Sequence, residues 1–146
     1  MWPFSFKKRK IRQASLEHAC RLITKQMHAA SGIDDFFNKS KNLWALGYCF
    51  GMLQASLETA DAEAKLQDSD YQVHVSSGLG RVYAEENLGL LFYRVGVSSM
   101  RLDQFHQGRI AGATEFVQVL NVKGDQAHGL LHYLRAAKLE PSPLVV

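Results

Sequence analysis

Hydrophobic residues recur at steps of three and four along most of the chain, which is the spacing of one helical face. Between residues 10 and 30 this spacing is followed by Leu16, Ala19, Cys20, Ile23, Met27 and Ala30. Ser31 and Gly32 interrupt it, as residues that end helices do. We therefore predict a first amphipathic helix over residues 10–30.

A second helix is predicted over residues 35–64, and its middle is an unbroken apolar run from Leu43 to Leu53. Because that run is apolar on every side, we expect this helix to be the central and most buried one. The run is well short of the about 20 residues that a bilayer-spanning helix needs. Residues 67–70 are polar and predict a turn.

Residues 71–80 give the least regular pattern. Tyr71, Val73 and Val75 alternate with polar residues as in a strand, but a lone strand would have no partner in this chain. We expect a helix instead, broken near Gly78 and Gly80 and resumed from residue 81 to residue 95.

Two more helices are predicted in the C-terminal third. Ser98 or Ser99 can cap the first of them, whose apolar face carries Leu102, Phe105, Gly112, Phe116 and Leu120. Lys123 and Gly124 end it, and Asp125 can cap the last helix. That helix turns inward Ala127, Leu130, Leu131, Leu134 and Ala137. The short connection predicts an antiparallel helical hairpin.

These elements predict an all-α, single-domain bundle of five to six helices, with helix two central and a C-terminal antiparallel helical hairpin. The helical domain covers residues 10–140, preceded by a flexible basic and aromatic arm over residues 1–9. Pro141 and Pro143 predict an extended tail over residues 141–146. A chain of 146 residues that is 47% hydrophobic is large enough to bury one core of this kind.

Charge is concentrated at the N-terminus. Lys7, Lys8, Arg9, Lys10 and Arg12 precede the first acid, although the whole chain carries only +3, so the remainder is slightly acidic. The arm interleaves its cations with Trp2, Phe4 and Phe6. That mixture suits a membrane interface or a nucleic-acid backbone, and it is also common in solvated chain ends.

Cys20 and Cys49 both lie within apolar helical patterns, so we expect two reduced core residues. The basic N-terminus is not followed by the apolar segment of a secretory signal. The sequence therefore predicts a cytoplasmic, soluble protein, peripheral to the membrane if the arm binds lipid.

Two Gly-xxx-Gly pairs, Gly47/Gly51 and Gly108/Gly112, lie in the middle of predicted helices. Glycine inside a helix costs about 0.5–1 kcal/mol relative to alanine, so two such pairs indicate close helix packing. Either the two helices cross inside one core, or one glycine stripe lies on the surface and receives a partner helix.

Arg109 falls near the centre of the apolar face that contains Phe105, Gly112 and Phe116. We expect a charge in that position either to be paired within the protein or to bind a ligand. Either it pairs with a carboxylate such as Glu58, or it anchors a carboxylate or phosphate ligand.

His128 and His132 have the spacing of two metal ligands on one helical face, and Glu115 is the acid most nearly level with them. No glutamate follows the first histidine as in zinc proteases, so this is a weak candidate site. No phosphate-binding glycine loop or nucleophile elbow is present, and no cofactor is predicted.

We therefore expect a non-enzymatic interaction protein, such as a small inhibitor, an immunity-type protein or an adaptor. It would bind a protein partner, or a second copy, through a helical face containing Gly47, Gly51, Gly108, Arg109 and Gly112. One alternative is a membrane- or nucleic-acid-associated factor held by the arm, and another is a metal-dependent helical enzyme using His128, His132 and Glu115.

Overall fold

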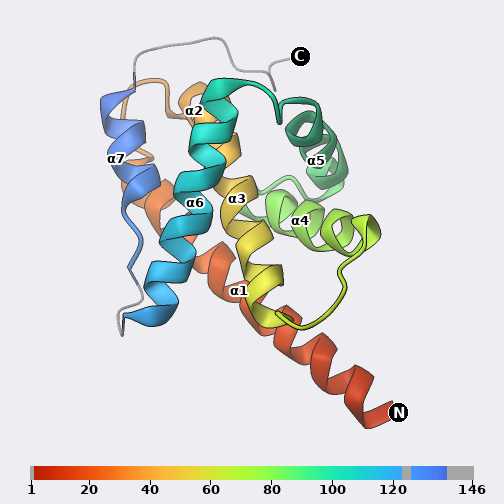
Figure 1. Cartoon of the computed structure of the whole chain (residues 1–146). Coiled ribbons are helices and arrows are strands. Elements are labelled where there is room, and N and C mark those ends of the chain that lie inside the picture. Colours follow the sequence, from red (N-terminus) through yellow and green to blue (C-terminus); the bar gives the residue numbers. More distant parts are fainter. Residues whose placement is uncertain (1, 123–125, 138–146) are drawn as a thin grey trace.

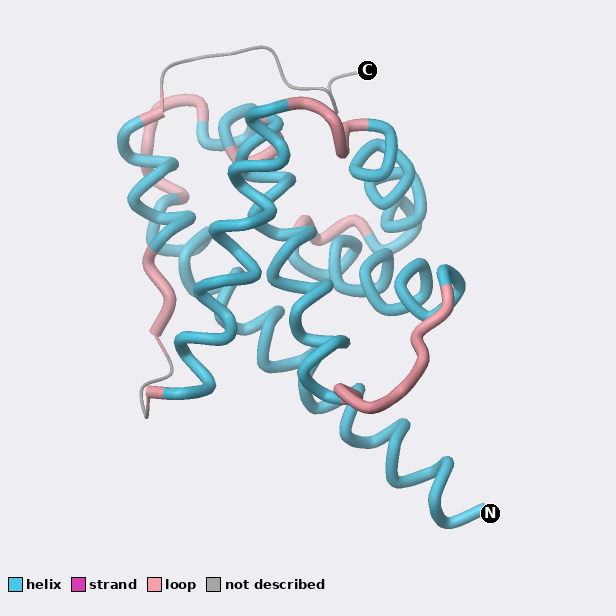
Figure 2. The backbone as a smooth tube through the Cα atoms, viewed as in Figure 1, coloured by secondary structure: helices cyan, strands magenta, loops and turns pink. Residues whose placement is uncertain are grey.

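The computed structural model describes residues 2–122 and 126–137, with side chains from Phe6 onward, and all regular structure in that part is helical (Figure 2). The all-α prediction is confirmed there. The helices are α1 (Trp2–Ala30), α2 (Phe36–Lys39), α3 (Leu43–Ala60), α4 (Asp68–Val82), α5 (Gly89–Ser98), α6 (Asp103–Asn121) and α7 (Gly129–Ala136), with a 3-10 turn, η1 (Glu86–Leu88). The described residues thus form seven α-helices, whereas five or six were predicted. The predicted extended tail over residues 141–146 lies outside the described residues. So do Lys123 and Gly124, which were predicted to end the fourth helix, and Asp125, which was predicted to cap the last one.

Helix α3 lies at the centre and contacts α1, α4, α5, α6 and α7 (Figure 1). Every residue from Ala45 to Leu53 is buried, as an all-apolar helix requires. The predicted helix over residues 35–64 is divided, however, because Asn42 adopts an extended conformation and its side chain accepts a hydrogen bond from the Ala45 amide. That cap starts a new helix instead of continuing α2.

Helix α4 runs through Gly78 and Gly80, where a break was predicted, and it begins at residue 68, where a turn was predicted. The Asp70 carboxylate accepts a hydrogen bond of 2.8 Å from the Gln67 amide and so starts the helix early. The two glycines instead permit close packing, because an added Cβ at Gly78 would collide with Leu53. The break comes later, where Ala84 has a φ of 54°.

Helix α6 begins at Asp103, not after Ser98 or Ser99 as predicted. Those serines close α5 instead, because their hydroxyls donate to the Arg94 and Val95 carbonyls at 2.7 Å. The buried face of α6 is Phe105, Gly108, Gly112, Phe116 and Val119. Leu102 and Leu120, which were predicted to point inward, lie at the edge of that face and are each 48% exposed.

Helix α7 buries Leu130 and Leu134, as predicted, and leaves Leu131 and Ala137 half-buried. It packs against α1 and α3 as well as α6. The C-terminal hairpin stays a prediction, because residues 123–125 between α6 and α7 are not described. Cys20 and Cys49 are free and buried, as predicted for reduced core residues.

Helix α1 begins at Trp2, so the backbone of residues 2–9 continues the helix that was predicted to start at Lys10. Its N-terminal turns project away from the other helices (Figure 1). None of residues 6–11 is buried, and the buried face of α1 starts at Leu16. Within the described residues, no helix combines the length and the apolarity that crossing a bilayer would require.

Candidate functional site

The two Gly-xxx-Gly pairs face each other across the contact between α3 and α6. An added Cβ at Gly47 or Gly51 would collide with the backbone carbonyl of Phe105 or Arg109, and the carbonyls of Trp44 and Tyr48 block Gly108 and Gly112 in the same way. The two helices therefore cross inside one core. All four glycines are buried, so a partner helix could reach this stripe only by displacing α6.

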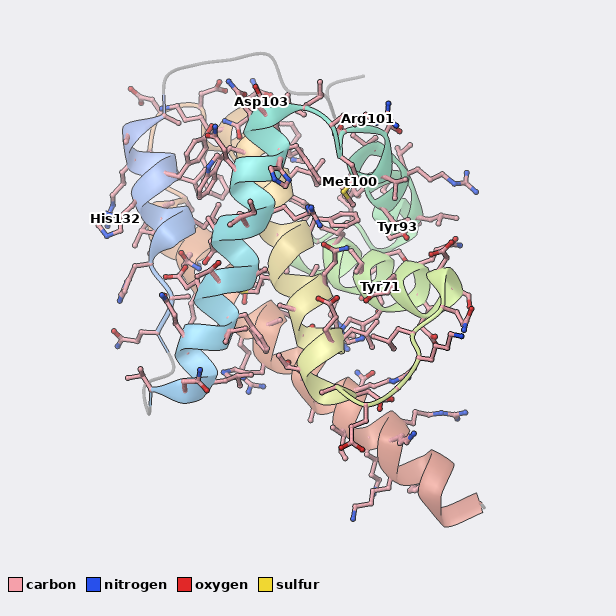
Figure 3. All side chains as sticks on the ribbon, in the orientation of Figure 1. Tyr71, Tyr93, Met100, Arg101, Asp103 and His132 are labelled. Atoms are coloured by element: carbon pink, nitrogen blue, oxygen red, sulfur yellow. The ribbon has the colours of Figure 1, made fainter. Side chains whose placement is uncertain are left out.

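The opposite side of α6 is exposed and nearly free of charge. Ile110, Val117 and Leu120 are 52%, 41% and 48% exposed. Polar neighbours on this side are His106, Gln107, Thr114 and Gln118. The only charged residues of α6 are Asp103 at its start (Figure 3), Arg109, and Glu115, which is half-buried. We call Ile110, Val117, Leu120 and these four polar residues the α6 outer face.

Arg109 borders the α6 outer face and has no carboxylate partner among the described residues. Its Nη1 donates to the Gln54 side chain at 3.4 Å, and its Nη2 lies 3.3 Å from His106 Nδ1, both long for hydrogen bonds. Its Nε is buried and has no hydrogen-bond partner in the described part of the chain. The predicted pairing with Glu58 is wrong, because Glu58 instead accepts a hydrogen bond from Tyr71. Arg109 therefore keeps an uncompensated charge beside an apolar surface.

Glu115 holds the start of α7. One carboxylate oxygen accepts from the Tyr48 hydroxyl and from the Gly129 amide at 2.9 Å, and the other accepts from the His128 amide at 3.0 Å. These amides are at the N-terminus of a helix, where a negative charge is favourable. No side chain of the residue preceding α7 caps it, so Glu115 does so from another helix.

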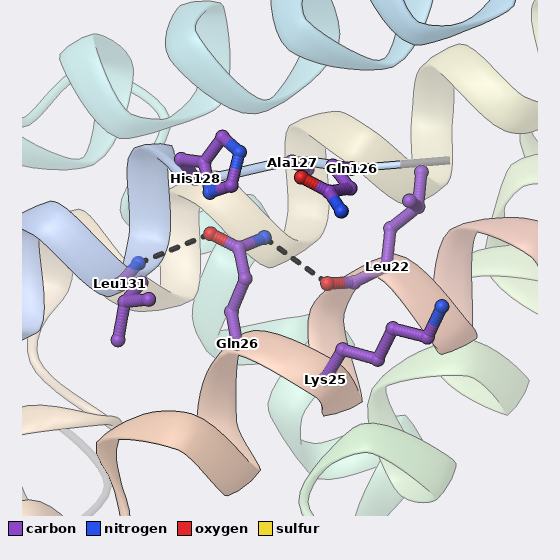
Figure 4. Close-up of a pocket in the computed structure, with 7 residues that line it drawn as sticks. All are labelled: Leu22, Lys25, Gln26, Gln126, Ala127, His128 and Leu131. Atoms are coloured by element: carbon purple, nitrogen blue, oxygen red, sulfur yellow. Dashed lines mark hydrogen bonds between the residues drawn. The ribbon is translucent and has the colours of Figure 1, made fainter. Parts of the chain in front are cut away.

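Gln26 of α1 extends this polar network. Its amide nitrogen donates to the Tyr48 hydroxyl at 3.1 Å, and its oxygen accepts from the Leu131 amide at 3.0 Å. Figure 4 shows Gln26 bridging from its own helix to α7 beside a cavity of about 240 Å³. The network fastens α7 to α1, α3 and α6.

His128 and His132 are both exposed, with ring centroids 6.4 Å apart, and His132 lies on the outer side of α7 (Figure 3). The Glu115 carboxylate does not join them, because it is held by the Tyr48 hydroxyl and the backbone. Among the described residues, no three His, Cys, Asp or Glu side chains gather closely enough to hold a metal ion. The predicted three-ligand group is therefore not formed.

The basic arm is exposed along the projecting turns of α1. Phe6 is 52% exposed, with the Lys10 ammonium 4.8 Å from its ring centroid, and Lys7 and Arg9 are also exposed. Lys8 lies 4.0 Å from Asp61. The side chains of Trp2 and Phe4, the other predicted aromatic residues of the arm, lie outside the described part.

A cavity of about 420 Å³ opens where the arm meets α4. It is lined by Arg9, Arg12, Gln13, Leu16, Leu57, Ser69, Asp70, Val73, His74 and Ser77. Arg12 donates to Asp61 and to Asp70 across it, at 2.7 and 3.1 Å. Sequence reasoning missed this cavity, because its walls come from helices whose contact no local pattern indicates.

A buried Ser56–His74 pair lies behind that cavity. Ser56 Oγ and His74 Nε2 are 2.7 Å apart, and Ser56 also donates to the Leu53 carbonyl. Ser56 is fully buried, so its hydroxyl cannot reach a substrate. Burial, with a smaller contribution from the Arg12 charge, lowers the pKa of His74 to about 4. The pair is therefore a neutral structural contact.

This histidine predicts a loss of stability in mild acid. The pKa of His74 is about 4 in the folded chain and 6.5 when unfolded, so below pH 6.5 the unfolded chain binds a proton that the folded chain does not. We expect this group to lower the free energy of unfolding by about 3 kcal/mol between pH 6.5 and 4. Urea denaturation of the wild type and of His74→Gln across that range measures it. His106→Gln, at an exposed site, should keep the wild-type slope, and parallel curves for wild type and His74→Gln would refute the assignment.

Two surfaces thus stand out, namely the α6 outer face with Arg109, and the arm with its cavity. No family model, curated protein or solved structure matches the chain.

Proposed function

We propose that this protein binds a protein partner through the α6 outer face. The observation that carries the proposal is an exposed, nearly uncharged aliphatic surface next to an arginine that no carboxylate in the described part of the chain pairs with. Protein interfaces are enriched in arginine and apolar residues and depleted in lysine, aspartate and glutamate, which is the composition of this face.

The α6 outer face is held in place before binding. Its helix is locked against α3 through backbone contacts at four glycines, so little conformational freedom is left to lose. Arg109 would then act as the anchor. A partner carboxylate would give its guanidinium short hydrogen bonds to an opposite charge, in place of the two long ones to Gln54 and His106.

The matching partner presents apolar side chains and one acidic residue. A second copy of this chain fits less well, because Asp103 is the acid available along this side. Pairing Asp103 with Arg109 of a second, antiparallel α6 would centre the contact near His106. Val117 would then lie about 16 Å from that centre and stay uncovered. A small inhibitor, an immunity-type protein or an adaptor remains the proposed class.

Site-specific photocrosslinking in the native cell tests this proposal. A photoreactive residue at position 117 should trap a defined protein, whereas one at the exposed position 63 should not. With that protein purified, we expect Val117→Glu or Arg109→Gln to weaken binding by about thirtyfold, as for residues at the centre of an interface.

Val97→Glu is the matched control, because it places the same charge on a similarly exposed valine of α5. It should leave the dissociation constant within about twofold. Equal trapping at positions 63 and 117, or equal affinity for all three variants, would overturn the proposal. Crosslinks between copies of this chain alone would point to self-association instead.

A further inference from the structure

The arm and the α1–α4 cavity form one continuous surface. Phe6, Arg9, Gln13 and Leu16 follow each other at steps of three, four and three residues, so they share one face of α1. The last three of them line the cavity, whose far wall is α4. The exposed Phe6 ring, the Arg9 guanidinium and the cavity between α1 and α4 therefore lie next to one another along this face.

The cavity is apolar at its floor and polar at its rim. Leu16 and Leu57 are buried beneath it, and Val73 is 70% exposed at its edge. Ser69 and Ser77 add hydroxyl groups around the opening. A surface that leaves a valine and a phenylalanine this exposed beside a cation suits an amphiphile better than a purely polar ligand.

Arg9 is the cation that remains available there. The charge of Arg12 is compensated by Asp61 and Asp70, and Asp70 is also held by the Gln67 amide. Among the described residues, Arg9 makes no hydrogen bond or ion pair. His74 at the wall is hydrogen-bonded to Ser56 and stays neutral at physiological pH. An anion entering the cavity would thus meet one uncompensated positive charge.

We propose that this surface binds an anionic phospholipid at the face of a bilayer. The phosphate lies at Arg9, the upper part of an acyl chain covers Leu16, Leu57 and Val73, and Phe6 enters the headgroup layer. A nucleic acid would offer a phosphate for Arg9 and a base for Phe6. It would offer nothing to cover the aliphatic floor, which favours the lipid.

Vesicle co-sedimentation with the full chain tests the proposal through two matched double variants. Phe6→Ser/Arg9→Gln removes one ring and one charge from the proposed face. Lys7→Gln/Ile11→Ser also removes one charge and one apolar side chain, but from the opposite side of α1, where Ile11 is 44% exposed. All four positions are exposed, so both variants should keep the wild-type melting temperature.

We expect the wild type to bind vesicles containing one-third phosphatidylglycerol and not vesicles of phosphatidylcholine alone. Lys7→Gln/Ile11→Ser should weaken binding about fivefold, the effect of one cation near an anionic surface. Phe6→Ser/Arg9→Gln should weaken it by about fiftyfold, because it also loses a charge-assisted hydrogen bond. Equal losses in the two variants would show general attraction to the arm and would overturn the site.

Two competitors separate the lipid from other anions. Millimolar inorganic phosphate should not release the bound protein, and its doing so would assign the cavity to a soluble phosphate instead. Single-stranded DNA should bind more weakly than the vesicles and should not distinguish the two double variants. Tighter binding of DNA than of vesicles, with the larger loss in Phe6→Ser/Arg9→Gln, would overturn the lipid assignment.

Discussion

Gly51→Ala is expected to lower the free energy of unfolding by about 3 kcal/mol or more, the range of severe overpacking in a core. The new methyl group would lie on the Arg109 carbonyl, which is a backbone atom and cannot rotate away. Helices α3 and α6 would have to separate along their crossing. The higher helix propensity of alanine offsets only about 0.5–1 kcal/mol of this loss. Urea denaturation followed by circular dichroism measures the change.

Gly32→Ala is the control for that substitution, because a Cβ at Gly32 meets nothing within 4 Å. Its effect should stay within about 0.5 kcal/mol. Gly112→Ala should resemble Gly51→Ala, and the double variant should lose less than the two effects added together, since the first methyl group already opens the seam. A Gly51→Ala protein as stable as the wild type would mean that α3 and α6 are not in backbone contact at Gly51.

The glycine pairs show what the sequence could predict about helix packing and what it could not. Their spacing correctly indicated close helix packing, but two arrangements satisfied it equally, and only the contact of α3 with α6 decides between them. Spacing along one helix specifies which residues share a face. It does not specify what that face meets.

The wrongly predicted helix ends are explained by local hydrogen bonds of side chains. Ser98 and Ser99 are residue types that cap a following helix, but their hydroxyls bond backward to α5. Asn42 divides the helix predicted over residues 35–64, because its side chain accepts a hydrogen bond from the Ala45 amide and so caps the start of α3. Both choices depend on side-chain rotamers, which hydrophobic periodicity does not report.

The parts of the candidate sites that join distant residues could not be predicted. Arg109 was recognised as misplaced, but its neighbour Gln54 and the engagement of Glu58 by Tyr71 depend on how α3, α4 and α6 are placed. The sequence also placed Glu115 level with α7. The histidine spacing led us to expect that Glu115 joins His128 and His132. Its actual partners include backbone amides at the start of α7, and residue types do not reveal which amides are free to donate.

Helix α7 should detach when Glu115 is replaced by alanine. The substitution removes the only acceptor described for the His128 and Gly129 amides, and the Tyr48 hydroxyl loses its carboxylate partner. Hydrogen bonds to a charged group contribute about 1.5–3 kcal/mol each, so we expect the free energy of unfolding to fall by about 3 kcal/mol. Glu115→Gln, which keeps one acceptor but no charge, should lose about half as much.

Amide hydrogen exchange distinguishes detachment of α7 from a general loss of stability. In Glu115→Ala, the amides of Leu131 and Leu134 should exchange faster by a larger factor than those of the α3 core, because the network that fastens α7 is broken locally. Glu58→Gln serves as the control, since Glu58 accepts a single exposed hydrogen bond from Tyr71. If α7 and α3 lost protection equally in Glu115→Ala, then Glu115 would stabilise the whole bundle and would not specifically hold its last helix.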